Sequence, residues 1–370
     1  MNGQWMGTYS NGAGRGRLVV ELDDIRDHYS GVAYFYSEQK GLPVTIAEIK
    51  LPKDSACLST RVPLFAVERG TARFIPIEEL EKALGGRPST WADVSWTLSP
   101  EKISATWKSE AGNAGTGTAL ASTAGEKSTL ETIPGIASWE DFKATVLKFK
   151  PNNHIFRGQE NSDWALRTAF HRTGRANLFR FMSEDIPALH RHLTAITPHR
   201  FNTNEPDEYA ALLNLVQHHG YPTPLLDWTA SPFIAAYFAF NNLRRGNYRA
   251  DQKVRIHIFE ARDWQGSFER AQRLHPAFLH ITVLEPLPLN NPRLIPQQGM
   301  SLPTNLDDIE RYIKEQETVS GRRFLTAIDL SVGERRTVMH ELDLMGINAG
   351  SLFPGLDGIC GQIREKYFDL

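Results

Sequence analysis

Cysteine, long apolar runs and an excess of either charge are all scarce in this sequence. The 370-residue chain has two cysteines, Cys57 and Cys360, which lie at opposite ends and so provide neither a disulfide framework nor a metal-ligand spacing. Its longest purely apolar run, residues 233–240, is far too short to cross a bilayer, and residues 1–5 lack the features of a secretory signal. The net charge of −2 argues against general binding to nucleic acids or membrane surfaces. We therefore expect a cytoplasmic protein, on which a local basic patch could still exist.

The length and composition predict two globular domains. A hydrophobic content of 41% and a charged content of 23% are typical of soluble proteins, and 370 residues suffice for two cores. Residues 109–126 are rich in Gly, Ala, Ser and Thr, which predicts a flexible, protease-sensitive linker. The 116–122 portion could instead be the last strand of the first domain. The predicted domains are therefore residues 1–125 and 126–370.

The first domain is predicted to be antiparallel β. Short β-rich runs are separated by Gly, Asp, Ser and Pro turns; they cover residues 18–22, 31–36, 44–49, 94–98 and 103–107. Polar and apolar residues alternate in 94–98, which indicates one solvated and one buried face, and residues 77–84 form a predicted helical insert. So many strands must close or stack, which favours a small barrel or a sandwich. The tryptophans of this region are expected in its core, with a binding cleft as the alternative: Trp5, Trp91, Trp96 and Trp107.

The second domain is predicted to be α+β. Ser138 is a plausible N-cap with Asp141 three residues later, and apolar residues then recur at helical spacing. Further predicted helices cover residues 164–171, 177–193, 207–216, 307–317 and 334–344. Predicted strands cover residues 154–159, 254–259, 278–284, 293–298 and 324–330. This alternation indicates that helices and strands share one core.

Residues 217–232 carry the largest concentration of chemically informative side chains. Gly220 and Pro222 are expected to end the helix before them, and residues 225–226 form a short buried strand. Ser231 then caps the next helix, with Pro232 at its first position. A helix N-terminus at the exit of a strand can bind an anion, so we expect a ligand here.

Arg157 and His218 are the first candidate functional residues. Arg157 ends a strand and could present its guanidinium to a diphosphate or carboxylate; the alternative is a buried ion pair with Asp227 or Asp163. His218 could act as a base or hydrogen-bond partner, or be a buried structural histidine. No His, Asp or Glu cluster at ligand spacing accompanies it, so we expect no metal.

The residues after the short strand offer both structural and functional interpretations. Trp228 could stack on a planar ring or fill the core, and Asp227 could orient His218 or cap a loop. Thr229 adds a hydroxyl beside them. The paired amides of residues 297–298, at the end of a predicted strand, could form the wall of a hydrogen-bonding pocket or an exposed strand end.

These residues resemble the FRG domain family, which is named after a Phe-Arg-Gly motif. The motif is Phe156-Arg157-Gly158 here, and the similarity covers about residues 135–370. It continues through Trp164, Gln217-His218, Gly220, Pro222-Thr223, Leu225-Leu226-Asp227-Trp228-Thr229, Ala235, Phe238-Ala239, Gly346-Ile347, Leu352-Phe353-Pro354 and Leu356-Asp357-Gly358. Pro224 departs from the family, which commonly has a basic residue there, and a proline cannot supply its phosphate contact. The family implies no firmly assigned activity.

A more distant resemblance is to ADP-ribosyltransferases of the arginine-serine-glutamate type, with their split sheet. Arg157-Gly158, then Thr229 and Ser231, then Ala235 and Phe238-Ala239, follow the same order. The resemblance implies that Arg157 binds the phosphates of NAD, that Thr229 and Ser231 bind its ribose, and that Trp228 or His218 contacts its ring. Gln297-Gln298 stand where that class has a glutamate, and an amide stabilises a ribosyl cation only poorly.

The expected function is therefore NAD or nucleotide recognition, with ADP-ribosyl transfer or NAD cleavage as the reaction. Turnover should be slow unless another carboxylate, such as Glu285 or Glu341, reaches the ribose. An acceptor protein and a bacterial antiviral or stress response belong to this expectation. The alternative is a non-catalytic module that holds a nucleotide or a partner peptide. Arg157, Ser231 and Gln298 are expected to line one cleft.

Overall fold

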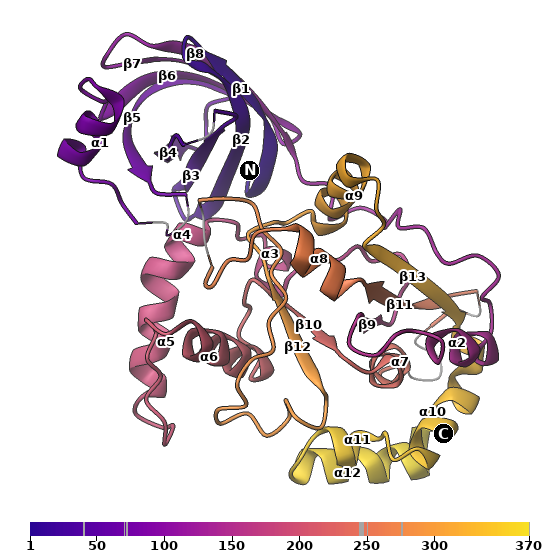
Figure 1. Ribbon diagram of the computed structural model, residues 1–370. Helices are drawn as coiled ribbons and strands as arrows, with labels where there is room; N and C mark the ends of the chain where they lie inside the picture. The colour runs from indigo at the N-terminus through magenta and orange to yellow at the C-terminus, as the bar shows by residue number, and fades with distance from the viewer. Residues whose placement is uncertain are drawn as a thin grey trace.

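The chain forms a β-barrel followed by a five-stranded sheet flanked by helices. The computed structural model describes residues 1–39, 41–69, 71, 73–243, 248–249, 251–274 and 277–369. Figure 1 shows the barrel at one end of the molecule and the sheet with its helices beside it. The predicted α+β class is confirmed. Among the described residues, no helix has the length and apolarity that a membrane span requires.

The barrel is closed, and its eight antiparallel strands follow one another in sequence order. They are β1 (Gly3–Asn11), β2 (Gly14–Ile25), β3 (His28–Ser37), β4 (Val44–Pro52), β5 (Cys57–Val67), β6 (Trp91–Leu98), β7 (Lys102–Ser109) and β8 (Ala114–Ala121). Pairing of β1 with β8 closes the ring, and α1 (Ile77–Leu84) connects β5 to β6. The sequence predicted a barrel or a sandwich, and the barrel is confirmed. β1 and β5 were not predicted, because glycine, proline and polar residues interrupt their apolar patterns.

The alternative for residues 116–122, a last strand of the first domain, is confirmed: β8 occupies 114–121 and completes the barrel, so a flexible linker is wrong for that part of 109–126. Its small residues serve packing. A Cβ at Gly115 would lie 2.5 Å from the Trp107 ring, and one at Gly117 would lie 2.8 Å from Leu18. Two residues after β8, the Thr123 hydroxyl donates to Asp308 at 2.6 Å, so the chain contacts the second unit directly after it leaves the barrel.

The second sheet has the strand order β12-β10-β9-β11-β13, and neighbouring strands are antiparallel. Its strands are β9 (Ile155–Gln159), β10 (Leu225–Thr229), β11 (Lys253–Phe259), β12 (Gly299–Pro303) and β13 (Leu325–Ser331). The strands predicted at 278–284 and 293–298 are wrong. Residues 281 and 284 form only isolated bridges, and 293–298 form a turn that ends with Gln298 at a φ of 45°. Ile281, Val283 and Leu294 of these segments are buried from irregular backbone instead, whereas Ile295 is exposed.

The helices of the second unit agree with most sequence predictions. They are α2 (Trp139–Val146), α3 (Ala169–Arg172), α4 (Leu178–Arg180), α5 (Ile186–Leu193), α6 (Pro206–His218), α7 (Pro232–Phe240), α8 (Ala261–Ser267), α9 (Ile309–Ser320), α10 (Arg335–Leu344), α11 (Ala349–Leu352) and α12 (Leu356–Arg364). Single π turns follow α4 and α12, at 181–185 and 365–369, and a 3₁₀ turn at 332–334 precedes α10. Ser138 and Asp141 form the predicted capping box of α2. The predicted helix over 164–171 is shorter than expected, because only its last residues coil into α3.

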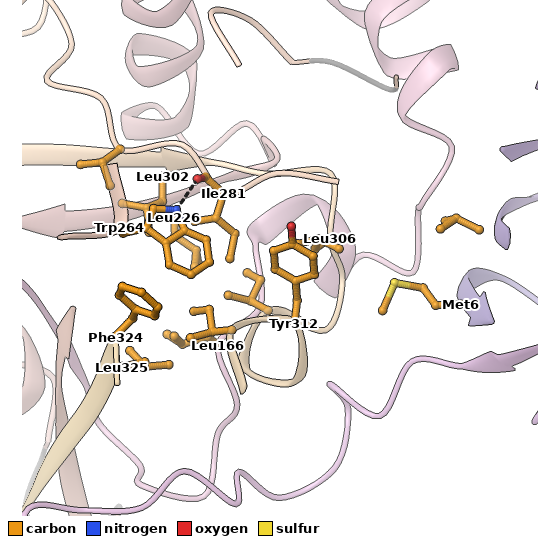
Figure 2. Packing of buried hydrophobic residues seen from close by; sticks show 14 of the residues in the cluster. Met6, Leu166, Leu226, Trp264, Ile281, Leu302, Leu306, Tyr312, Phe324 and Leu325 are labelled. Atoms are coloured by element: carbon orange, nitrogen blue, oxygen red, sulfur yellow. Dashed lines mark hydrogen bonds between the residues drawn. The ribbon is translucent and has the colours of Figure 1, made fainter. Parts of the chain in front are cut away.

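Each face of the sheet carries its own hydrophobic core. One face packs against α2, α7 and α10, with α7 directly over Gly158, where a Cβ would lie 1.9 Å from the Ala235 carbonyl oxygen. The opposite face packs against α8 and α9 and extends to the outer surface of the barrel. Figure 2 shows this second core, in which Trp264 donates to the Ile281 carbonyl at 2.8 Å and Met6 of β1 lies on the barrel side.

Buried acidic side chains also join the barrel to the second unit. Glu21 of β2 accepts a hydrogen bond from the N–H of Leu178 at 3.0 Å. Asp23 accepts those of Ala176 and Asn177, at 2.8 and 3.0 Å, so both acids meet the start of α4. Burial raises the pKa of Glu21 to about 8.

Candidate functional site

The sheet is nearly divided between β9 and β10. These strands share one residue pair, Phe156 with Thr229, whereas β9 pairs with β11 along its whole length. Beyond that pair the ladder stops, and Arg157 reaches across, where its Nη1 donates to the Asp227 carbonyl at 2.5 Å. We call this region the strand split; it comprises residues 157–159 of β9 and 225–227 of β10. A side chain here replaces the backbone ladder, so the strand split depends on one arginine.

Arg157 has no carboxylate partner in the described part of the chain. Among the described residues it forms no ion pair, and its Nε is buried without a hydrogen-bond acceptor. Asp163, the other partner considered, pairs instead with Lys127 at 2.7 Å. Burial lowers the pKa of Arg157 to about 10, and Asp227 offsets this only in part. A partly buried guanidinium without a carboxylate partner among the described residues would be stabilised by an anion.

A second arginine adds to the positive charge of the strand split. Arg172, at the end of α3, is exposed, and its Nη1 donates to the Arg167 carbonyl at 2.7 Å. Partial desolvation at its base and the charge of Arg167 lower the pKa of Arg172, and the charge of Arg172 in turn lowers the pKa of Arg157. Arg167 is neutralised by a bidentate pair with Asp307. Asp227 is the acidic group that acts on both remaining arginines.

Asp227 is held by α6 but stays half exposed. Gln217 donates to its Oδ1, and the Thr223 hydroxyl donates to the Gln217 amide oxygen. The Nε2 of His218 lies 4.0 Å from the same carboxylate oxygen. Its Nδ1 lies within hydrogen-bond distance of the Asn291 amide oxygen, at 3.1 Å. The Asp227 side chain is 48% exposed, so solvent or a ligand can reach it. The structure thus brings Arg157, His218 and Asp227 together.

Thr229 and Ser231 lie at the other end of β10 and use their hydroxyls internally. Thr229 donates to the Gln297 carbonyl at 2.8 Å and accepts from the N–H of Ser231 at 3.1 Å. Ser231 caps α7 by accepting the N–H of Ile234 at 3.3 Å, and Pro232 begins the helix. No hydrogen bond within the described ranges joins either residue to Arg157.

Gln297 and Gln298 meet this same end of β10. The Gln298 carbonyl accepts from the N–H of Ala230 at 3.0 Å, and the Gln297 amide donates to the Leu352 carbonyl at 3.0 Å. The glutamines therefore lie beside Ser231, whereas Arg157 projects from the sheet face opposite to the one that α7 covers. The sequence-predicted residues fall into two groups along β10.

Trp228 and His257 line the buried side of the strand split. Trp228 is 4% exposed and packs against His257 and Phe259, with ring centroids 6.3 and 5.8 Å apart, so it fills the core. His257 pairs with Arg157 in register, and its Nε2 lies 3.8 Å from Glu310, beyond hydrogen-bond distance. Burial lowers the pKa of His257. Sequence reasoning missed His257, although β11 carries polar residues at every second position of an apolar run.

The nearby buried polar atoms are poorly satisfied. The indole Nε1 of Trp228, both ring nitrogens of His257 and the amide oxygen of Gln159 lack hydrogen-bond partners, as does the Nε of Arg157. Such atoms are few in folded proteins and tend to gather at functional sites or at ordered waters. Among the described residues, no three His, Cys, Asp or Glu side chains converge as metal ligands.

Comparison with known proteins supports one part of the sequence interpretation. Residues 152–247 match the model of the FRG domain, which supports the FRG resemblance of this region. No curated protein matched the chain. A redesigned β-barrel is 15% identical over 32% of this chain and 89% of that one, with a TM-score of 0.23. A redesigned β-barrel bound to DFHBI is 15% identical over 32% of this chain and 93% of that one, with a TM-score of 0.23. A de novo designed fluorescence-activating β-barrel is 14% identical over 33% of this chain and 93% of that one, with a TM-score of 0.21. These TM-scores are too low to support a conclusion.

Proposed function

We propose that the strand split binds the phosphates of a nucleotide-type ligand, with NAD as the leading candidate. The observation that carries this proposal is Arg157, a desolvated guanidinium that has one carbonyl partner, a free buried Nε and no ion pair within the described chain. Arg172 adds a second cation at the exposed side. A diphosphate offers oxygens to both arginines, and arginine binds phosphate in a bidentate manner.

The energetic argument favours an anion over a neutral ligand. A buried unpaired donor costs about 1–3 kcal/mol, and a hydrogen bond to a charged group contributes about 1.5–3 kcal/mol. A phosphate oxygen at Arg157 removes the first cost and adds the second. The aromatic contact expected from Trp228 is not part of this proposal, because that side chain fills the core. The adenine or nicotinamide ring would have to be bound elsewhere.

For the reaction, we propose Asp227 as the carboxylate that the Gln298 position lacks. In NAD cleavage or ADP-ribosyl transfer, the glycosidic C–N bond breaks, nicotinamide leaves with the electron pair, and water or an acceptor protein attacks the ribosyl cation. A half-exposed carboxylate beside the phosphate site can stabilise that cation. Glu341 is engaged at 2.6 Å by Lys143 and at 2.9 Å by Trp139, which favours Asp227 over it. The ADP-ribosyltransferase-like fold, the cytoplasmic location and the bacterial antiviral or stress setting remain parts of this proposal.

The binding test is calorimetric titration of ADP-ribose into the wild-type protein and arginine variants. Arg157→Gln should weaken binding by roughly ten- to a hundredfold, as expected for a charge-assisted bond of about 1.5–3 kcal/mol. Arg172→Gln should weaken it less, and because this side chain is exposed its variant should fold normally. Arg61→Gln is the matched control, since Arg61 pairs with Asp93 outside the barrel. Equal affinity in all four proteins would overturn the phosphate site.

The catalytic test is nicotinamide release from NAD. Asp227→Asn keeps the shape of the side chain and removes its charge, so it should abolish release while the melting temperature stays within the wild-type range. ADP-ribose affinity should not fall, because the lost negative charge acts on both arginines. Binding of ADP-ribose without any release by the wild-type protein would favour the alternative, a non-catalytic nucleotide-binding module. Release that survives Asp227→Asn would refute the assignment of this carboxylate.

A further inference from the structure

The barrel is packed at one end and hollow at the other. At the packed end, large side chains from several strands fill the lumen: Trp5, Leu22, Ile49, Leu51 and Leu98. Trp5 also donates to the Pro100 carbonyl at 3.2 Å, which ties β1 to the turn that closes this end. Eight-stranded barrels are just wide enough for side chains to fill, so this packing is ordinary.

Small residues leave the other half of the lumen open. Inward positions there carry alanine on four strands, at Ala33, Ala47, Ala92 and Ala105. They line a cavity of about 970 Å³. Pockets that bind drug-sized molecules measure about 300–1,000 Å³, and interiors otherwise pack to crystal-like density. An apolar cavity of this size that is open to solvent favours an apolar occupant, because covering its surface is stabilising.

The cavity lining is apolar and aromatic. Phe35, Trp96 and Trp107 contribute rings, and Val62 and Leu64 contribute aliphatic groups. The Trp96 indole N–H is already bound to Thr60 at 2.8 Å. Within the described part of the chain, the lining includes no aspartate, glutamate or lysine. This lumen would reject a multiply charged ligand, because desolvating each charge would be costly.

Helix α1 presents an unburied apolar stripe to the cavity. Ile77, Leu80 and Leu84 recur at helical spacing and line the cavity, yet no residue of α1 is buried. Ile77 and Leu84 are each 48% exposed, and Phe65 and Phe74 beside them are 43% and 47% exposed. Covering apolar surface contributes about 25 cal/mol per Å². A ligand in the cavity would therefore also stabilise the position of α1.

Arg87 is the charged side chain in the described lining. It lies in the α1–β6 connection, is exposed, and forms no hydrogen bond or ion pair with the described residues. The acid whose pKa its charge lowers, Glu110, already accepts hydrogen bonds from the N–H and hydroxyl of Thr90 at 3.1 and 3.0 Å. One cation at the mouth of an apolar lumen fits one anionic head group.

We propose that the barrel binds an amphiphile of the fatty-acid type, with its apolar chain in the lumen and its anionic head at Arg87. The chain would pack against the rings of Phe35 and Trp107 and under the apolar stripe of α1. This site is separate from the strand split, because the lumen and the outer surface of the barrel are opposite faces of its strands. It does not depend on the proposed nucleotide function.

The first experiment uses 1-anilinonaphthalene-8-sulfonate, an apolar aromatic probe with one anionic head, and competition by dodecanoate. The wild-type protein should enhance probe fluorescence at one site, and dodecanoate should displace the probe. Ala105→Phe fills the lumen and should weaken probe binding at least tenfold without lowering the melting temperature. Thr106→Phe is the matched control, since it places the same ring on the outer face of the same strand, where Thr106 is exposed. Equal binding by both variants would overturn the lumen site.

The second experiment tests the head group. Dodecanoate should bind more tightly than dodecanol, dodecylammonium should bind most weakly, and Arg87→Gln should remove the preference for the acid. If all three compounds bind alike, the assignment of Arg87 is refuted. Should Ala105→Phe fail to fold, Ala92→Leu fills the same cavity with a smaller change. Probe binding should persist in Arg157→Gln, because that residue lies outside the barrel.

Discussion

Replacing Gly158 with alanine should separate α7 from the sheet. The added Cβ would lie 1.9 Å from the Ala235 carbonyl oxygen and 2.6 Å from the Ala239 amide nitrogen. Both distances are shorter than 3.0 Å, a separation below which Cβ atoms are essentially never found. Both are backbone atoms of a buried helix, so no flexible side chain can move aside. Overpacking a core costs about 1–3 kcal/mol, and we expect the upper part of that range or more. The glycine of the Phe-Arg-Gly motif is therefore needed for space.

Thermal and urea unfolding, followed by circular dichroism, measure this cost. Gly266→Ala is the control, because its Cβ would meet no atom within 4 Å and it lies in α8. An alanine in a helix is more stable than a glycine by about 1 kcal/mol, so the same chemical change should have the opposite sign there. Gly158→Ala should also weaken ADP-ribose binding, since Arg157 precedes it on β9. A Gly158→Ala protein as stable as wild type would refute the close approach of α7.

Three further outcomes follow from single contacts. Burial raises the pKa of Glu21 to about 8, so between its ordinary value of 4.5 and 8 the folded state holds a proton that the unfolded state releases. Stability should therefore fall as the pH rises through that window, and urea titrations at several pH values should show no such slope in Glu21→Gln. Ser138→Ala removes the acceptor of the Asp141 N–H, bound at 3.2 Å, and should cost about 1 kcal/mol in the same assay. Gln4→Ala breaks a buried 2.7 Å bond to the Asn305 carbonyl; it should cost about 1–3 kcal/mol and speed limited proteolysis between barrel and sheet.

Periodicity made the barrel and most helices predictable from sequence. The alternation in β6 and the Ser138 cap of α2 are local signals that tertiary contacts reinforce. β8 was ambiguous because glycine and alanine indicate flexibility as readily as close packing, and the position of Trp107 decides between them. The error at residues 293–298 has a similar origin: apolar residues predict burial, but irregular backbone can also supply it.

The candidate site was predictable only in its parts. The sequence identified Arg157 and Asp227, yet their contact runs from a side chain to a backbone carbonyl, which no residue pattern specifies. The near division of the sheet depends on where β9 and β10 stop pairing, a property of the whole fold. The sequence predicts one cleft for Arg157, Ser231 and Gln298 because all three lie near strand ends, but the ends of strands in one sheet can lie on opposite edges and faces of that sheet. Asp227 and Thr229 share one face of β10, so their position along the strand separates the two groups.

The continuous burial of β2 shows how a sequence can encode contact between two folded units. A barrel strand with one solvated face should alternate, as β6 does, but residues 18–22 are apolar except for Glu21, and all of them are buried. Both faces of β2 must therefore be covered. Side chains from the other barrel strands pack on its inner face, and the second unit packs on its outer face. An acid in such a run needs a donor, and the N–H of Leu178 supplies it. A carboxylate in an otherwise uninterrupted apolar strand of an antiparallel barrel thus predicts a polar anchor to a neighbouring element.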